Sequence, residues 1–311
     1  MKTKITHSEK VAATFIKNGK LVGFPTETVY GLGANVFDED AVKKIFKIKN
    51  RPADNPLIVH ISDVSQINLL IQKMTPIAKK IIENFFPGPI TIILKKNLII
   101  SDLVTAGLDT IAIRMPSDIS TRKFIEYCGT PVAAPSANIS GSPSPTSWKH
   151  VNADLNGKVD CILWGKNSEH GIESTVVDCT GKFPKILRPG SVSIKDLEKI
   201  FSKVEMEKIP KNGIAKSPGM KYKHYSPEAE IILVKSPSEI SLESISTTKI
   251  GFIGFEIVRR IAKSKRVSTK ENYAKHLFDF FRKCDEIGIE KIYCQKVDME
   301  GIGLADRKST R

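Results

Sequence analysis

Pro25-Thr-Glu-Thr-Val-Tyr-Gly-Leu-Gly33 is the stretch of this sequence that says most about the chain. It directly follows Gly19–Phe24, a short, mostly apolar run that predicts a strand. Two hydroxyls, a carboxylate, a phenol and two glycines stand within these nine residues, whereas a simple turn needs one or two such residues. Several polar groups together with close backbone approach are typical of a ligand-binding loop. We therefore expect a strand that leads directly into a binding loop.

The glycines of this loop do not make a known nucleotide fingerprint. Gly31-Leu-Gly33 resembles the start of a dinucleotide-binding loop, but no third glycine follows at the spacing that the fingerprint needs. The polar residues before Gly31 also replace the simple turn from strand to helix that such a loop requires. No G-x-x-x-x-G-K-[ST] sequence occurs in the chain. Both the Rossmann and the P-loop interpretations are therefore rejected for this segment.

Outward from the loop, residues 1–200 alternate short strands with amphipathic helices, which places the chain in the α/β class. A helix is predicted at Asp38–Lys47 with Asp38 as its N-cap, another begins at Thr75-Pro76, and a third begins at Ser193. Because some predicted strands are adjacent in sequence and others are separated by helices, we expect a mixed sheet. The predicted strands are Leu57–Ile61, Ile90–Lys95, Thr110–Arg114, Val132–Ala134, Val159–Leu163, Ser174–Asp178 and Lys185–Arg188.

The chain is long enough for two domains, and its composition changes where they should meet. A stretch rich in Lys, Pro and Gly predicts a linker at 206–229, between a larger domain at 1–205 and a smaller one at 230–311. The smaller domain contains predicted strands and one long helix in alternation, so we expect a small parallel α/β, Rossmann-like unit. Its predicted elements are Ile231–Val234, Ile250–Ile253, the helix Asn272–Cys284 and Ile289–Cys294.

Composition excludes several classes of protein. With 41% hydrophobic and 26% charged residues, the chain is typical of an ordinary globular protein. It has neither the ~18–20-residue apolar run of a membrane helix nor the apolar region of a signal peptide, so we expect no membrane contact and a cytoplasmic location. Its five cysteines are scattered without C-x-x-C spacing, which predicts small buried side chains in a reducing compartment.

The net charge of +14 favours an anionic partner, such as a nucleotide or tRNA. A solvated lysine-rich surface accounts for the same charge, so RNA contact stays open. Lys49 and Arg51 stand at the end of a predicted helix and could either complement the helix dipole or hold phosphate together. Arg114 and Arg188 each end a predicted strand, where two cations can converge on one edge of a sheet.

Several of these stretches together resemble the YrdC-like family, and within it the two-domain threonylcarbamoyl-AMP synthases. The resemblance covers residues 8–228 almost continuously and the C-terminal unit more thinly. It implies a YrdC-like twisted mixed sheet with flanking helices for the larger domain. The motifs that carry it are Phe24–Gly33, Lys49-Asn-Arg-Pro52, Asn55-Pro-Leu-Ile-Val-His60, Phe86-Pro-Gly-Pro89 with Thr91, Val104-Thr-Ala-Gly-Leu108, Ala134-Pro-Ser-Ala-Asn138, Glu173-Ser-Thr175, Leu187-Arg-Pro-Gly190 and Ser217–Tyr225.

The resemblance implies a nucleotidyltransferase. Threonine and bicarbonate would form a carbamate that attacks the α-phosphorus of ATP and releases pyrophosphate. A threonylcarbamoyl transferase complex would then pass the group to an adenosine of tRNA. Because the carbamate is already an anionic nucleophile, no Ser–His or Cys–His pair is needed, and catalysis would depend on positioning and on cations beside the phosphates.

The resemblance also implies roles for individual residues, carried over motif by motif. Threonine would be surrounded by Thr28, His60, Arg114, Ala134 and Ser174. ATP would be held by Arg51, Asn55, Thr110, Ser136, Ser144, Arg188 and, from a linker folded over the site as a lid, Tyr222. Lys49 and Arg51 would serve catalysis through their charge. Mg²⁺ would accompany ATP, with Glu27 as a weak ligand candidate.

Two alternatives remain open at this stage. One is an enzyme that makes a carbamoyl adenylate in hydrogenase maturation, although that type carries acylphosphatase and zinc-finger segments that this sequence lacks. The other is an RNA-binding or regulatory protein without catalysis. The sequence also ends at Arg311, where the family usually continues through a longer basic helix, which leaves the role of the second domain open.

Overall fold

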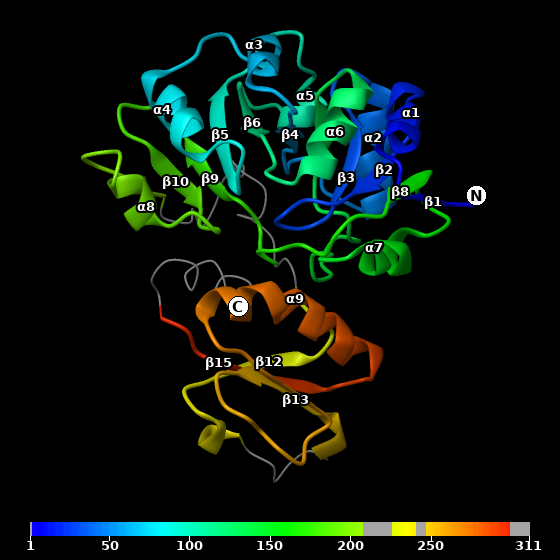
Figure 1. Cartoon of the computed structure of the whole chain (residues 1–311), viewed down its shortest axis with the longest axis vertical. Helices are drawn as coiled ribbons and strands as arrows, with labels where there is room; N and C mark the ends of the chain where they lie inside the picture. Colours follow the sequence, from blue (N-terminus) through cyan, green and yellow to red (C-terminus); the bar gives the residue numbers. More distant parts are fainter. Residues whose placement is uncertain (1, 208–225, 241–246, 299–311) are drawn as a thin grey trace.

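The computed structural model describes residues 2–207, 226–240 and 247–298 of the chain (Figure 1). Within these ranges the chain forms two sheets, a large mixed one in the N-terminal part and a small one in the C-terminal part. The large sheet ends with β11 (Glu205–Met206) and the small one begins with β12 (Glu230–Val234). Most of the predicted linker, 206–229, lies outside the described residues. None of the described helices is long and apolar enough to cross a membrane.

The large sheet contains parallel and antiparallel neighbours, which confirms the predicted mixed sheet. Its order in space is β1-β8-β2-β3-β7-β4-β6-β5-β9-β10-β11. The bounds of its other strands are β1 (Lys4–Thr6), β2 (Val22–Phe24), β3 (Gly31–Asn35), β4 (Ile58–His60), β5 (Ile90–Lys95), β6 (Thr110–Arg114), β7 (Val132–Ala134), β8 (Cys161–Leu163), β9 (Thr175–Asp178) and β10 (Lys185–Arg188).

The helices of the N-terminal part start where the sequence places caps. Asp38, Thr75 and Ser193 each accept a backbone hydrogen bond at the start of their helices, as predicted, and each satisfies one amide that the helix itself leaves unpaired. The α-helices here are α1 (Glu9–Lys17), α2 (Glu39–Lys49), α3 (Ile67–Leu70), α4 (Pro76–Phe85), α5 (Asp102–Thr105), α6 (Ile119–Cys128), α7 (Trp148–Leu155) and α8 (Ile194–Glu198), with a short 3₁₀ turn η1 (Val64–Gln66).

The loop predicted at Pro25–Gly33 is shorter than the sequence suggests. Gly31 and Gly33 belong to strand β3, so the loop itself ends at Tyr30. A Cβ atom on Gly31 would lie 2.8 Å from the Phe24 ring, and one on Gly33 would lie 2.9 Å from it. The glycines therefore leave room for the buried Phe24 ring beside the neighbouring strand, which is the close approach that glycine permits.

Strand register brings distant residues to one level in the middle of the sheet. β4 pairs in parallel with β6, so that His60 stands opposite Arg114, and antiparallel with β7, so that Ile58 stands opposite Ala134. Short strands with buried apolar side chains support this region on the core side, where Val59, Ile113 and others are fully buried. Residues from three separate motifs thus meet without any of them being close in sequence.

The small sheet is parallel throughout, in the order β12-β15-β13-β14, which confirms the predicted parallel α/β unit. Its long helix α9 lies on the face of this sheet that is turned toward the N-terminal part (Figure 1). The remaining bounds are β13 (Ile250–Gly254), β14 (Lys263–Arg266), α9 (Lys270–Glu286), β15 (Lys291–Gln295) and the 3₁₀ turns η2 (Pro237–Glu239) and η3 (Thr247–Lys249).

Candidate active site

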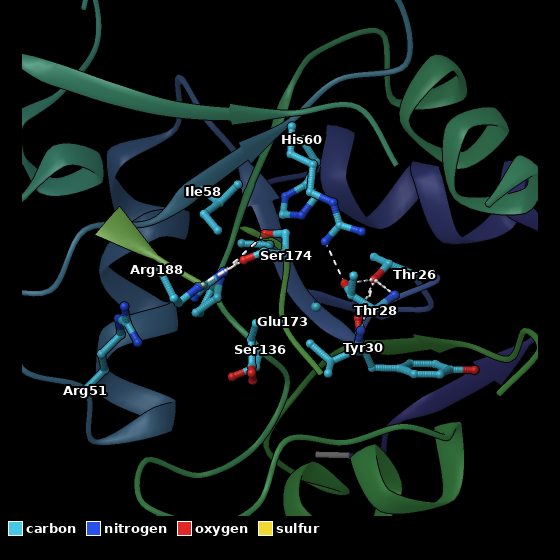
Figure 2. A pocket seen from close by; sticks show the side chains of 15 residues that line it. Thr26, Thr28, Tyr30, Arg51, Ile58, His60, Ser136, Glu173, Ser174 and Arg188 are labelled. Atoms are coloured by element: carbon cyan, nitrogen blue, oxygen red, sulfur yellow. Dashed lines mark hydrogen bonds between the residues drawn. The ribbon is translucent and has the colours of Figure 1, made fainter. Parts of the chain in front are cut away.

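The loop between β2 and β3 is shaped by its own threonines. The Thr26 hydroxyl donates to the Val29 carbonyl at 2.6 Å and accepts from the amides of Thr28 and Val29, both at 3.2 Å. Because the single hydroxyl proton of Thr26 is used in this way, Thr28 donates in the 2.8 Å contact between the two side chains. The loop borders a cavity. Tyr30 turns its ring away from this cavity, and its hydroxyl donates to the Gly165 carbonyl at 3.1 Å (Figure 2). The polar residues of the loop therefore fix its shape before any ligand binds.

Arg114 lies beside this loop and lines the same cavity, and its positive charge is already paired. Its Nη1 donates to the Thr28 hydroxyl at 2.6 Å, and its Nη2 lies 2.7 Å from Oε1 of Glu27. Both charged side chains are almost fully buried, at 4% and 2% exposure. Burial raises the pKa of Glu27, but the charge and hydrogen bond of Arg114 outweigh burial and hold that pKa below its ordinary value. Glu27 therefore stays ionised and holds the guanidinium in place.

His60 lies beside this pair and is neutral at physiological pH. Burial, assisted by the positive charge of Arg114, lowers the pKa of His60 to about 3. A neutral imidazole keeps one acceptor nitrogen, and its Nδ1 has no hydrogen-bond partner among the described residues. His60 can thus accept a hydrogen bond from a ligand hydroxyl or ammonium group without adding a second positive charge.

This shift predicts that wild-type stability falls on acidification. The folded His60 pKa lies below its unfolded value, so the unfolded chain takes up a proton first, and stability is lost as the pH falls from about 6.5 toward 3. Between pH 7 and pH 5 we expect His60 to account for a loss of about 2 kcal/mol. Urea unfolding of wild type and of His60→Gln at both pH values measures this difference. Equal losses in the two proteins would contradict it.

Ser174 and Arg188 lie in the middle of the cavity, between the side that carries Thr28 and the side that carries Arg51 (Figure 2). Arg188 donates through Nε and Nη2 to the Ser174 carbonyl, at 3.1 and 3.0 Å, and through Nη2 to the Ser174 hydroxyl at 3.1 Å. Thr91, from the neighbouring strand β5, holds the same hydroxyl at 2.8 Å. Because strands β5, β9 and β10 are adjacent, these three residues are placed by sheet pairing, and the Arg188 cation is fixed in front of Ser174.

Lys49 and Arg51 separate at the end of α2. Asn50 adopts the left-handed conformation at φ 50° and ends the helix there, so the two side chains leave in different directions. Lys49 is fully buried and donates to the carbonyls of Ser136 and Asn138, whereas Arg51 lines the cavity and donates to the carbonyls of Asn55 and Pro56, at 3.2 and 2.9 Å. Burial and the nearby Arg51 lower the pKa of Lys49 well below its ordinary value.

The structure brings most of the residues expected from the sequence to one cavity. Figure 2 shows Thr26 and Thr28 on one side of it and Arg51 on the opposite side, with Ser174 and Arg188 between them. The expected residues that line it are Thr28, Arg51, His60, Arg114, Ala134, Ser136, Ser174 and Arg188. The sequence-based list left out Thr26, Val29, Tyr30, Ile58 and Glu173, which line it as well. Glu173 directly precedes Ser174 in the Glu173-Ser-Thr175 motif, and this position next to an expected site residue is the sequence feature that could have indicated it.

Other expected residues lie outside the lining. Lys49 lies behind the loop that carries Ser136, and its catalytic role stays a prediction. Asn55 is buried, and its side-chain oxygen has no hydrogen-bond partner among the described residues. Thr110 begins β6, two residues before the level of Ile58, and Ser144 is buried with its hydroxyl donating to Glu173 at 2.7 Å. Tyr222 lies outside the described residues.

The cavity contains cations and hydroxyls rather than a nucleophile with its base. All five cysteines are buried away from it, as predicted, and burial raises the pKa of Cys128, Cys161 and Cys284 to about 12. Within the described residues no group of three or more His, Cys, Asp or Glu could hold a metal ion. Such a site is suited to binding anions and to stabilising charge on phosphate.

Comparison with known proteins matches both parts of the chain to family models. Residues 14–190 match the Sua5/YciO/YrdC model, described as telomere recombination, and residues 192–307 match the C-terminal domain of threonylcarbamoyl-AMP synthase. The chain belongs to the threonylcarbamoyl-AMP synthase family. The family relative from Pyrococcus abyssi is 42% identical over 308 residues, covering 95% of this chain and 91% of its own length. The Bacillus subtilis relative is 40% identical over 311 residues, covering 94% and 89%.

Solved structures of this family agree with the fold. The crystal structure of Pyrococcus abyssi Sua5 complexed with L-threonine matches with a TM-score of 0.92 and 41% identity, covering 99% of this chain and 96% of that one. Escherichia coli YciO, at 23% identity, covers 60% of this chain with a TM-score of 0.53 and shares the fold. The two-domain arrangement is therefore that of the threonylcarbamoyl-AMP synthase family.

Proposed function

We propose that this protein makes L-threonylcarbamoyl-AMP from L-threonine, bicarbonate and ATP and releases pyrophosphate, the first step of tRNA threonylcarbamoyladenosine modification. The observation that carries this proposal is one cavity with a buried, paired arginine at one end and a second arginine at the other, in a chain of this family. The solved relative from Pyrococcus abyssi that binds L-threonine supports the amino-acid substrate.

The Arg114 end suits threonine. Its guanidinium is buried beside the Thr28 hydroxyl and can meet the amino-acid carboxylate with a charge-assisted hydrogen bond. Neutral His60 adds an acceptor for the ammonium or the hydroxyl, and Ala134 leaves room on the neighbouring strand. Ser174 lies on the way to the ATP end, where the carbamate must form. A compact end of this kind selects a small amino acid with a side-chain hydroxyl.

The Arg51 end suits ATP. Arg51 and Arg188 supply two fixed positive charges, and Ser136 adds a hydroxyl on the loop between them. Asn55, whose buried side-chain oxygen has no partner among the described residues, stays a proposed ATP contact on the strength of the family resemblance. Lys49, although behind the lining, fixes the Ser136 loop by donating to the carbonyls of Ser136 and Asn138. Thr110, Ser144 and Tyr222 remain proposed ATP contacts on the strength of the family resemblance.

The chemistry follows from these two ends. The threonine amine attacks bicarbonate carbon, and loss of water leaves an N-carboxylate. An oxygen of this carbamate forms a bond to the α-phosphorus while the bond from that phosphorus to the bridging oxygen breaks, and pyrophosphate leaves with the electron pair. Because the nucleophile is already an anion, the protein needs to align the reactants and to stabilise charge on the phosphates. We propose that Arg51 and Arg188 supply this stabilisation.

Mg²⁺ is proposed to enter with ATP. Glu27, the earlier candidate ligand, is committed to Arg114 and does not line the cavity, whereas Glu173 does. Magnesium in nucleotide sites keeps several waters and takes one or two carboxylates in addition to phosphate oxygens, so a single carboxylate here fits it. Bound in this way, the ion would offset the triphosphate charge, and Glu173 would hold it beside the ATP end.

The product is proposed to pass to a threonylcarbamoyl transferase complex in the cytoplasm, and the net charge of +14 leaves RNA contact as a further proposal.

Pyrophosphate release by the purified protein tests the proposed function. We expect release with ATP, bicarbonate and threonine together and none when threonine is omitted. Release without threonine would instead indicate a carbamoyl-adenylate enzyme, and no release, with salt-sensitive RNA binding, would indicate a binding protein.

A further inference from the structure

Helix α9 of the C-terminal part packs directly on the loops of the active site. Val29 and Ile172, one on each loop, belong to the same buried apolar cluster as Tyr273, Leu277 and Phe281 of α9. Val29 also lines the cavity, and Ile172 precedes Glu173 and Ser174 in the chain. The core of the second domain therefore continues up to the wall of the site.

Gly171 shows how close this contact is. It adopts φ +72°, and a Cβ atom there would lie 2.5 Å from both the Cα and the carbonyl oxygen of Lys275. The backbone of α9 thus touches the backbone of the loop two residues before Glu173. A side chain at this position would push the helix and the loop apart.

Arg282 connects α9 to the loop between β7 and α7, which carries Ser136 and Ser144 of the proposed ATP end. Its Nη1 and Nη2 donate to the two carboxylate oxygens of Asp154, at 2.9 and 2.7 Å, and Nη2 also donates to the Pro143 carbonyl. Pro143 precedes Ser144, whose hydroxyl donates to Glu173 at 2.7 Å. Arg282, which is 9% exposed, therefore stands at the start of a short chain of contacts that ends at a cavity carboxylate, Glu173.

A second contact supports the same loop. The Thr146 amide donates to Nδ1 of His150 at 3.2 Å, so the proton of that ring is on Nε2, which faces Asp279 of α9 at 3.4 Å. The Tyr30 amide in turn donates to the Pro145 carbonyl at 2.8 Å. Residues 143–146 are thus held by α9 on one side and by the threonine loop on the other.

We propose that α9 is a structural wall of the ATP end and that Arg282 is a positioning residue, which sets the place of Ser144 and Glu173 through the Pro143 carbonyl. The proposal rests on the proposed function in one respect, since it takes the Arg51 end to be the ATP end. It gives the second domain a role in the reaction itself. Nucleotide affinity should therefore depend on a residue that touches no substrate.

The test is steady-state kinetics of Arg282→Ala, with Arg282→Lys and Arg266→Ala beside it. We expect Arg282→Ala to raise KM for ATP about tenfold or more while KM for threonine changes less than about twofold, because only the ATP loop is released. Arg282→Lys keeps one donor and should recover part of the loss. Arg266, an exposed arginine on edge strand β14 that donates to the Phe255 carbonyl, is the matched control and should leave both constants unchanged.

Asp154→Asn separates the effect of the Arg282–Asp154 ion pair on stability from the effect of the Arg282–Pro143 contact on ATP binding. It weakens the ion pair but leaves the Arg282 contact with Pro143, so thermal stability should fall while KM for ATP stays near the wild-type value. An unchanged KM for ATP in Arg282→Ala, or equal rises in both KM values, would overturn the proposal. If wild type gave no threonine-dependent turnover, the proposed function would fail. Backbone hydrogen exchange of residues 142–147 would then decide, because slow exchange retained in Arg282→Ala would overturn the inference.

Discussion

Arg114→Ala is expected to abolish most threonine-dependent turnover and to destabilise the fold at the same time. The side chain offers threonine a fixed, buried charge, and loss of a hydrogen bond to a charged group, worth about 1.5–3 kcal/mol, corresponds to roughly 10- to 150-fold in kcat/KM. It also leaves Glu27 buried without its partner, which costs about 3–5 kcal/mol. Pyrophosphate release against threonine concentration and urea unfolding at pH 7 measure the two effects.

The stability part of this prediction has its own pH dependence. Without Arg114, only the backbone hydrogen bonds from Ser117 and from Glu27 itself still oppose burial, and we expect burial to raise the Glu27 pKa above that of the unfolded chain. A group with a raised folded pKa gains stability as the pH falls and the folded state takes up the proton. The deficit of Arg114→Ala relative to wild type should therefore shrink between pH 7 and pH 5. A constant deficit would contradict the buried Glu27–Arg114 pair.

The double variant Glu27→Gln with Arg114→Ala is the control. It removes the unpaired charge, so it should recover stability relative to Arg114→Ala and show no shrinking deficit on acidification. Threonine use should stay lost, because the cation is still missing. Recovery of threonine-dependent turnover in the double variant would show that Arg114 acts only on the fold.

Arg51→Ala is expected to act on ATP alone. We expect KM for ATP to rise about ten- to hundredfold, because a guanidinium fixed by the Asn55 and Pro56 carbonyls is lost from the phosphate end, while KM for threonine stays within about twofold. Lys47→Ala, which removes an exposed charge from the last turn of α2, just before Arg51, is the matched control. Equal changes in the two KM values would contradict the division of the cavity into two ends.

Local patterns in the sequence predicted the local structure well. Asp38, Thr75 and Ser193 cap their helices because capping depends on a few neighbouring residues, and the strands of the mixed sheet lie close to their predicted ranges. Strand β3 was missed because its glycines look like a loop. These glycines are required by tertiary packing, because they make room for the ring of Phe24 on the adjacent strand.

The site was predictable as a set of motifs and less so as a geometry. Lys49 and Arg51 look equivalent in sequence, yet the left-handed Asn50 sends one into the core and the other into the cavity. Glu27 looks like a free carboxylate until the fold places Arg114 beside it. The contact of Arg282 with Pro143 joins residues that are 139 positions apart, and no local pattern indicates it.

The product formed from isotope-labelled bicarbonate, threonine and ATP tests the central claim most directly. Mass spectrometry of the reaction mixture identifies which groups the new molecule contains. We predict a single adenylate that carries both threonine and the labelled carbon, formed together with pyrophosphate. A labelled product that lacks threonine, or AMP with no labelled adduct, would contradict the claim that this cavity joins threonine, bicarbonate and ATP.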